Sequence, residues 1–98
     1  MNKKVEPAHA GTLESRDLFV RVVPMESEGI EIELESTVYE IYADAIKATI
    51  FESAKALNAN GIKIMVQDKG ALDYVIKARV QAAILRAYGI NEPDWSVL

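Results

Sequence analysis

The chain has 98 residues and a formal net charge of -4, half of its residues are hydrophobic, and it contains one histidine and no cysteine. This length is typical of a single domain. The acidic balance argues against binding to nucleic acids or acidic membranes, because both require clustered basic residues. Without cysteine, the chain has no disulfide, no thiolate metal site and no thiol nucleophile of its own.

Residues 1–8 are polar and contain Pro7, as expected for a flexible N-terminal tail. No apolar run follows Lys3 and Lys4, and none approaches the roughly 20 residues needed to span a bilayer. We therefore expect a cytoplasmic protein with one domain over residues 1–98, in which residues 91–98 form a C-terminal tail.

A hairpin is expected near the N-terminus. Residues 9–15 and 18–23 are predicted to pair, with Ser15-Arg16-Asp17 as the tip. Serine and aspartate favour this position because their side chains bond to nearby backbone groups in turns. The pattern places a primary hydroxyl, that of Ser15, at an exposed bend.

Residues 30–35 read Ile-Glu-Ile-Glu-Leu-Glu, an alternation without interruption. This pattern predicts a strand with three apolar side chains facing inward and three glutamates facing water. Because like charges on one strand face repel, we expect basic side chains such as Arg21 and Lys63 opposite the glutamates.

The first helix is expected to begin with Ser36 or Thr37 as its cap, and Thr37 with Glu40 would form a capping box. It should run to about Leu57, with Gly61 as a left-handed stop. Its buried face is predicted to consist of Val38, Tyr42, Ile46, Thr49, Ser53 and Leu57. Phe51 falls on the polar side, either as an ordinary exposed aromatic or as a subunit contact.

Residues 62–67 form the next expected strand, and a second helix should follow from Ala71 to about Tyr88, where Gly89 stops it. This helix has two apolar stripes, which requires packing on two sides. The second side is covered either by the first helix or by a partner protein. The stripes are Leu72, Ile76, Val80, Ala83, Ala87 and Tyr74, Val75, Ala78, Ala82, Leu85.

The expected order is therefore β-β-β-α-β-α. It predicts an α+β fold, a small two-layer sandwich with a mostly antiparallel sheet and two helices on one face. A helix between the third and fourth strands makes a crossover, which allows these two strands to be parallel.

The residues offer no catalytic machinery. Ser15 would need a base, and His9, the only histidine, lies in or beside the tail. One histidine and scattered carboxylates do not make a metal site. The turn at residues 68–71 precedes a helix N-terminus, which can hold an anion, but it lacks the glycine spacing of a phosphate-binding loop. From the residues alone, Ser15 is an ordinary turn serine that another enzyme could modify.

Two segments resemble the acyl carrier protein of citrate lyase, its gamma subunit. The first is residues 10–15 with Asp17 after them. The second is residues 68–73, followed by Ile76, Ala78 and Arg79. The resemblance extends from about Pro7 to Trp95. Ordinary acyl carrier proteins instead place Asp-Ser-Leu at the start of a helix in an all-helical bundle, whereas a strand pattern follows Ser15 here.

The resemblance implies that Ser15 carries 2'-(5''-phosphoribosyl)-3'-dephospho-CoA through a phosphodiester bond. It implies a non-catalytic carrier subunit whose imported thiol bears acetyl and citryl groups while citrate is cleaved to acetate and oxaloacetate. The implied partners are an alpha subunit, which is an acyl transferase, a beta subunit, which is a citryl lyase, and a prosthetic-group transferase.

Other residues of the two segments are expected to support the attachment hairpin or to be recognised by the transferase: Gly11, Glu14, Asp17, Asp68, Lys69, Gly70, Asp73 and Arg79. Two alternatives stay open. The carrier subunit of malonate decarboxylase is related, but its counterpart regions carry Gly-Ser-Gly-Asp and Asp-Phe-Gly, which this chain does not share. A non-catalytic assembly adaptor would never be modified at Ser15.

Overall fold

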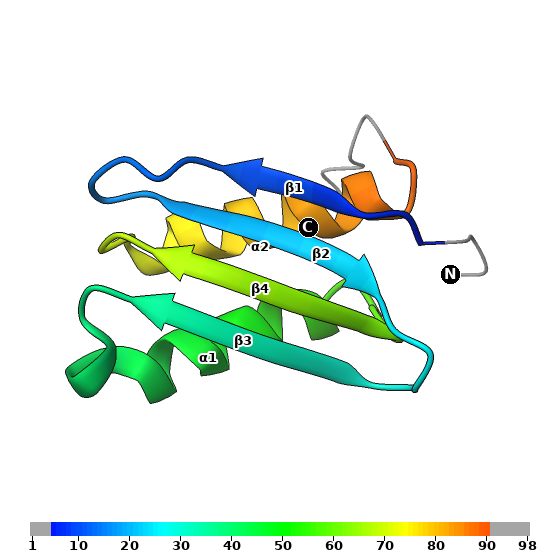
Figure 1. Ribbon diagram of the computed structural model, residues 1–98, viewed down its shortest axis with the longest axis horizontal. Coiled ribbons are helices and arrows are strands. Elements are labelled where there is room, and N and C mark those ends of the chain that lie inside the picture. The colour runs from blue at the N-terminus through cyan, green and yellow to red at the C-terminus, as the bar shows by residue number, and fades with distance from the viewer. Residues whose placement is uncertain (1–4, 91–98) are drawn as a thin grey trace.

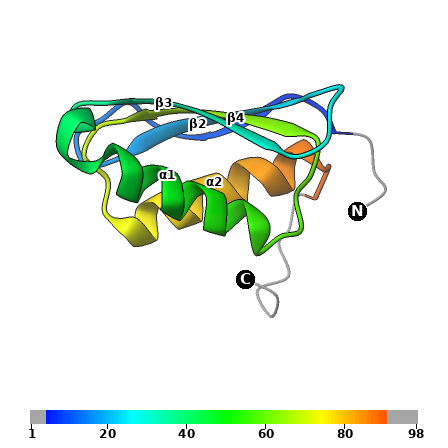
Figure 2. The same ribbon diagram turned by 90° about the horizontal axis from the view of Figure 1, so that it is seen from below.

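A computed structural model describes residues 5–90. The elements are β1 (Ala8–Gly11), β2 (Leu18–Pro24), β3 (Ile30–Ser36), α1 (Tyr39–Lys55), β4 (Ile62–Asp68) and α2 (Asp73–Ala87). Figure 2 shows both helices on one face of the sheet, so the molecule has two layers. The predicted α+β class and the order β-β-β-α-β-α are confirmed.

The sheet has the order β1-β2-β4-β3 (Figure 1). β1 pairs antiparallel with β2, β2 pairs antiparallel with β4, and β3 pairs parallel with β4. The parallel pair follows from α1, because a helical crossover returns the chain in the same direction. As a result, β3 and β4 end at the same end of the molecule as the β1–β2 loop (Figure 1).

The core lies between the sheet and the helices. Alternate residues of β2 and β4 point inward, as the period of two requires, and they meet one stripe of each helix. Each fully buried aliphatic side chain contributes about 1.5–3 kcal/mol to folding. The buried residues of this interface include Val20, Val22, Ile62, Ile64, Ile50, Ile76, Val80 and Ile84.

The glutamates of β3 point to the sheet face opposite the helices, and Lys63 of β4 lies among them. The Lys63 ammonium is 3.4 Å from a Glu33 carboxylate oxygen, so this expected neighbour is confirmed. Arg21 was also expected opposite the glutamates. Its register partner in β4 is Met65, and β4 separates it from β3, so that expectation is wrong.

The start of α1 differs from the prediction. Val38 occupies the cap position and no side chain caps the helix, so the expected box of Thr37 and Glu40 does not form. The reason is that β3 continues to Ser36, where the parallel register places it against Asp68. The Ser36 hydroxyl accepts a hydrogen bond from the Val38 N–H and donates one to Asp68 instead.

The end of α1 also differs. The helix ends at Lys55, and Asn58 adopts the left-handed conformation with φ 55° that was assigned to Gly61. Asparagine tolerates this conformation better than most residues. Gly61, with φ 69°, lies in the next turn, where its N–H donates to the Gly29 carbonyl.

Several residues expected inside are exposed. Tyr42 of α1 has 53% of its surface in solvent, whereas Ile50, which the wheel omitted, is fully buried. Tyr74 of α2 and Leu72, which caps its start, are exposed, whereas Ile84, which neither predicted stripe includes, is fully buried. α2 packs on the sheet and on α1, which accounts for its two apolar sides. Phe51 is exposed and lies under the Lys55 ammonium, and its role as a subunit contact stays a prediction.

The predicted N-terminal tail is too long. Ala8 already belongs to β1, Val5 packs on the core, and the Glu6 N–H donates to the Ala87 carbonyl at 2.9 Å. The other predicted tail, residues 91–98 with Pro93 and Trp95, lies outside the described residues. Within residues 5–90, neither helix is long and apolar enough to cross a membrane.

Candidate functional site

The loop between β1 and β2 presents Ser15 to solvent. β1 ends at Gly11 rather than at residue 15, so residues 12–17 form a loop longer than the predicted tip. Ser15 is exposed, and Arg16 beside it has a left-handed φ of 64°. Among the residues that the structure describes, none forms a hydrogen bond with the Ser15 hydroxyl, so this group is free to react with an external molecule.

Asp17 braces the loop from inside. The Thr12 hydroxyl donates to Asp17 Oδ2 at 2.8 Å, and the Leu18 N–H donates to Asp17 Oδ1 at 2.8 Å. The Glu14 N–H in turn donates to Thr12 Oγ1 at 3.2 Å, and the Glu14 carbonyl accepts from the Asp17 N–H. These bonds fix the backbone on both sides of Ser15.

Arg79 of α2 clamps the same carboxylate. Its Nε donates to Asp17 Oδ1 and its Nη2 to Asp17 Oδ2, both at 3.0 Å, which is the bidentate geometry that guanidinium groups favour. The Asp17 side chain is 14% exposed. Burial alone raises the pKa of Asp17, but the bonds from Arg79, Thr12 and the Leu18 N–H, with the Arg79 charge, outweigh it and hold that pKa below its ordinary value.

The backbone of Lys69 holds the loop from the other side. The Arg16 N–H donates to the Lys69 carbonyl at 2.8 Å, and the Lys69 N–H donates to the Asp17 carbonyl at 2.9 Å. These two bonds, to adjacent residues of the loop, continue the β2–β4 ladder beyond its last register pair, Leu18 and Asp68. The two sequence segments that carried the resemblance are therefore in direct contact.

Gly11 is required at the base of the loop. It has φ +93°, and a Cβ at this position would lie 1.9 Å from the Leu18 carbonyl oxygen. That oxygen accepts the hydrogen bond of the Thr12 N–H, which closes the hairpin. Any larger residue would push the two strands apart at the start of the loop.

Asp68 organises the neighbouring turn. Its carboxylate is almost fully buried and accepts from the Ser36 hydroxyl at 2.8 Å and from the Ala71 N–H at 2.9 Å. The turn between β4 and α2 is thereby tied to the end of β3, and Gly70 supplies the φ of +89° that the turn needs. Asp68 thus fixes the segment on which the Ser15 loop rests.

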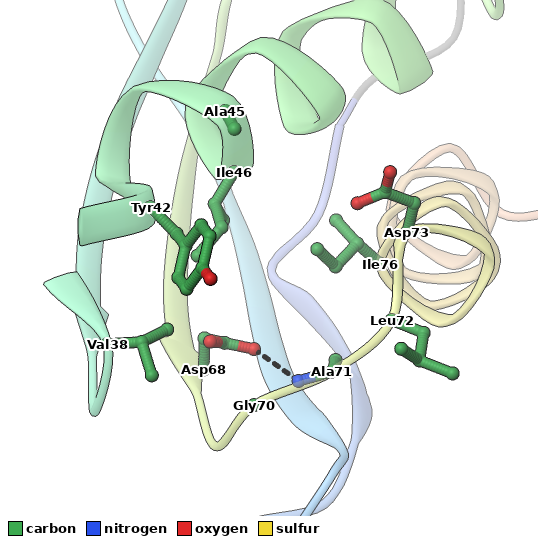
Figure 3. Close-up of a pocket in the computed structure, with 10 residues that line it drawn as sticks. All are labelled: Val38, Tyr42, Ala45, Ile46, Asp68, Gly70, Ala71, Leu72, Asp73 and Ile76. Atoms are coloured by element: carbon green, nitrogen blue, oxygen red, sulfur yellow. Dashed lines mark hydrogen bonds between the residues drawn. The ribbon is translucent and has the colours of Figure 1, made fainter.

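A groove of about 400 Å³ lies beside this turn, between the first turns of α1 and α2 (Figure 3). Tyr42 projects into it from α1, and Ile76 faces it from α2. The wall is apolar apart from the Tyr42 hydroxyl and two carboxylates. Asp68 lies at the inner end, and Asp73 is exposed at the N-terminus of α2.

The candidate residues differ in how directly they contact the Ser15 loop. Gly11, Asp17, Lys69 and Arg79 contact the loop directly, as shown above, and Asp68 and Gly70 lie one step behind them. Asp73 lies apart, at the groove. Thr12 was expected only as part of the first segment and Ser36 only as a possible helix cap, but the hydroxyl of each donates to an aspartate. The bond of Thr12 could have been predicted from the sequence, because a hydroxyl residue and an aspartate lie in the same turn.

The site can present a hydroxyl but does not activate it. The ring of His9, in β1, packs against Phe19, with 5.4 Å between ring centroids. Within residues 5–90, no group of three His, Asp or Glu side chains is arranged to hold a metal ion. A nucleophilic serine needs an adjacent base, so the geometry fits a residue that another enzyme modifies.

The fold and this loop match a family of small carrier proteins. Residues 5–87 match the acyl carrier family model described as malonate decarboxylase delta subunit (MdcD). Citrate lyase acyl carrier proteins from two strains of Vibrio cholerae serotype O1 are each 45% identical over 96 residues, covering 98% of both chains. The chain belongs to the family of citrate lyase acyl carrier proteins.

A solved structure shares the fold. A chain of the Pseudomonas malonate decarboxylase hetero-tetramer, crystallised with malonate, superimposes with a TM-score of 0.74 and 20% identity, covering 87% of each chain. At this identity, the likeness concerns the fold alone.

Proposed function

We propose that this chain is the acyl carrier subunit of citrate lyase and that Ser15 holds 2'-(5''-phosphoribosyl)-3'-dephospho-CoA through a phosphodiester bond. The observation that carries the proposal is the exposed Ser15 hydroxyl, which has no hydrogen-bond partner within residues 5–90 and sits on a loop braced from two sides. The 45% identity to citrate lyase acyl carrier proteins supports it independently.

The residues around Ser15 fit such a group. Nearby positive charge favours attachment of an anionic phosphodiester. Arg16 and Lys69 have exposed cationic side chains, and their backbones are hydrogen-bonded to each other beside Ser15. No hydrogen bond of the described chain would have to break to free the hydroxyl. In the attachment step, Ser15 Oγ forms a bond to a phosphorus atom of the precursor and its proton passes to a base of the transferase. The bond from that phosphorus to the oxygen of the precursor's leaving group breaks, and the leaving group departs with the electron pair.

The attached group would supply the thiol that the chain lacks, which can carry acetyl and citryl groups as thioesters. The chain itself tethers the group. Tethering raises its effective concentration at each partner active site without new contacts. The proposed partners are the alpha subunit (acyl transferase), the beta subunit (citryl lyase) and the prosthetic-group transferase, in a cytoplasmic hetero-oligomer.

Arg79 and Asp17 serve in this proposal as positioning residues. They hold the base of the loop on α2 through two bonds of 3.0 Å, so the transferase meets a preformed loop. Preorganisation lowers the entropy lost when the complex forms. Glu14, Asp73 and the Lys69 side chain are exposed and are available for recognition by the transferase.

The carrier subunit of malonate decarboxylase is the second candidate, and the description of the family model favours it. The two can be separated by reconstitution. Citrate cleavage should appear with citrate lyase alpha and beta subunits, and malonate decarboxylation should not appear with the corresponding malonate decarboxylase subunits. The reverse result would assign the chain to malonate decarboxylase.

Attachment itself is tested by incubating the chain with transferase and precursor and mapping the peptides by mass spectrometry. The added mass is expected on the Ser15 peptide and is expected to vanish in Ser15→Ala. Ser27→Ala is a matched control, since Ser27 is an exposed serine in another turn. Modification at any other residue, or none in the presence of an active transferase, would contradict the proposal.

A further inference from the structure

The groove between the first turns of α1 and α2 begins next to the Ser15 loop. The Arg16 N–H lies 2.8 Å from the Lys69 carbonyl oxygen, and the next residue, Gly70, lines the groove. Standard bond lengths and angles of the planar peptide groups on both sides of this hydrogen bond place the Cα atoms of Ser15 and Gly70 at most about 8 Å apart. A group attached to Ser15 can therefore reach the groove without any movement of the backbone.

The walls of the groove favour an apolar ligand and disfavour an anionic one. Tyr42 and Leu72 border it with 53% and 58% of their surfaces exposed, so an apolar ligand would remove hydrophobic area from water (Figure 3). The carboxylates of Asp68 and Asp73 line the same groove and repel anions. The Asp68 carboxylate is already bonded to Ser36 and Ala71, so it offers little to a donor on a ligand.

The size also fits. A volume of about 400 Å³ lies within the range of roughly 300–1,000 Å³ typical of small-molecule sites. Of the proposed prosthetic group, the phosphates and ribose are charged or strongly polar, whereas the pantetheine segment is neutral, with amides and short alkyl stretches. The Tyr42 hydroxyl projects into the groove and can bond to an amide (Figure 3).

We propose that this groove binds the neutral pantetheine segment of the arm attached to Ser15, so that the arm rests on its own carrier between visits to the partner subunits. This inference rests on the proposed function. In the resting position the arm thiol is sheltered by Tyr42 and Leu72, and the phosphates stay outside, near Arg16 and Lys69. Binding of a partner then competes with a weak intramolecular contact.

The thiol gives a direct readout that does not depend on catalysis. Because the chain has no cysteine, the only thiol of the modified protein is that of the arm. Its reaction rate with an aromatic disulfide reagent should be about threefold or more below that of free pantetheine, which corresponds to an arm docked for most of the time. In nitrogen-15 NMR spectra, attachment should shift the amide signals of Ala45, Gly70 and Ala71, as well as those of residues 12–17.

Two variants and one control test the location. Ala45→Phe should fill the groove from its rim, and Leu72→Asp should add a charge while placing a good capping residue before α2. Both should raise the thiol rate to that of free pantetheine. Ala48→Phe, at an exposed position of α1 outside the groove, should leave the rate unchanged.

The result that would overturn the inference is a modified Ser15 whose thiol reacts as fast as free pantetheine in the unmutated protein, with shifts confined to residues 12–17. Equal rates in Ala45→Phe, Leu72→Asp and Ala48→Phe would overturn it as well. Intact mass separates this failure from that of the proposed function, because a chain that the transferase never modifies contradicts both. Circular dichroism of each variant verifies that the fold is kept.

Discussion

Removal of the Arg79 guanidinium is the sharpest perturbation of the loop that carries Ser15. In Arg79→Ala, Asp17 loses two charge-assisted hydrogen bonds of 3.0 Å but keeps those of Thr12 and the Leu18 N–H. A bond to a charged group is worth about 1.5–3 kcal/mol. Because the Arg79 side chain is 43% exposed, solvent screens the pair, and we expect a net loss of about 1–2 kcal/mol.

Urea unfolding followed by circular dichroism measures this loss. With a urea slope of about 1–1.5 kcal/mol/M for a small domain, the midpoint should fall by roughly 1 M. Arg79→Lys should recover part of the loss, since one of the two bonds can be rebuilt. Lys77→Ala, at an exposed position of the same helix, should stay within about 0.5 kcal/mol of the unmutated chain.

The loop should also become a poorer substrate for the transferase. In Arg79→Ala the rate of Ser15 modification should fall mainly through a higher KM, because the hydroxyl is intact while its loop is less ordered. If Arg79→Ala changed neither the unfolding midpoint nor the modification rate, the clamp would have no role in stability or presentation, and the reasoning from the bidentate geometry would be refuted.

Three further perturbations follow from the same contacts. Because the pKa of Asp17 is lowered in the folded state, the ionised carboxylate stabilises the fold fully above the ordinary pKa of 3.8. This stabilisation is lost as the pH falls through the lower folded-state pKa. Urea midpoints measured across this pH range should therefore fall more steeply with acid in the unmutated chain than in Asp17→Asn. Thermal unfolding should show that Gly11→Ala lowers stability by about 2 kcal/mol or more, because the new Cβ would meet the Leu18 carbonyl oxygen. The control Gly89→Ala, with φ +77° and open space around it, should lower stability by only about 1 kcal/mol. Equal losses would argue against the close approach at Gly11. In urea unfolding, Asp68→Asn should lower stability by about 1–3 kcal/mol, since the amide has one oxygen and cannot accept from both Ser36 and Ala71 in the same geometry. An unchanged midpoint would contradict the two hydrogen bonds assigned to the buried Asp68 carboxylate.

The strands were the most predictable part of the fold. Residues alternate between a more buried and a more exposed face of the sheet over Ile30 to Glu35 and over Leu18 to Val23. This pattern can be recognised within each strand, without knowledge of its neighbours. The parallel pairing of β3 and β4 followed from the helix between them. The sheet order β1-β2-β4-β3 was not predicted, because nothing within one segment specifies its neighbour.

The helix termini and faces were predicted less well. Thr37 has the local signature of a cap, but the register of β3 against β4 places Ser36 against Asp68, and Val38, one residue after Thr37, takes the cap position. Tyr42 and Leu72 have the apolar character of core residues, yet they lie at the N-terminal ends of α1 and α2 and line the groove instead. Propensity and periodicity are local, and long-range pairing overrides them.

The candidate site divides in the same way. Ser15, Asp17 and Arg79 could be named from two short segments. The contact between Asp17 and Arg79 could not be predicted, because the two residues are 62 positions apart in the sequence. Thr12 belongs to the first of these segments, but its bond to Asp17 was not predicted, since it depends on the direction of one hydroxyl. The groove has no sequence signature, because its walls come from the first turns of two helices and one connecting turn.

The central claim is that Ser15 carries a covalent prosthetic group, and the most direct measurement is the mass of the Ser15 peptide from protein isolated from its native cell during growth on citrate. An added mass equal to phosphoribosyl-dephospho-CoA is expected on the peptide that contains Ser15, with no addition in Ser15→Ala expressed in the same cell. An unmodified Ser15 peptide in cells that actively cleave citrate would contradict the claim and leave the chain as an assembly adaptor.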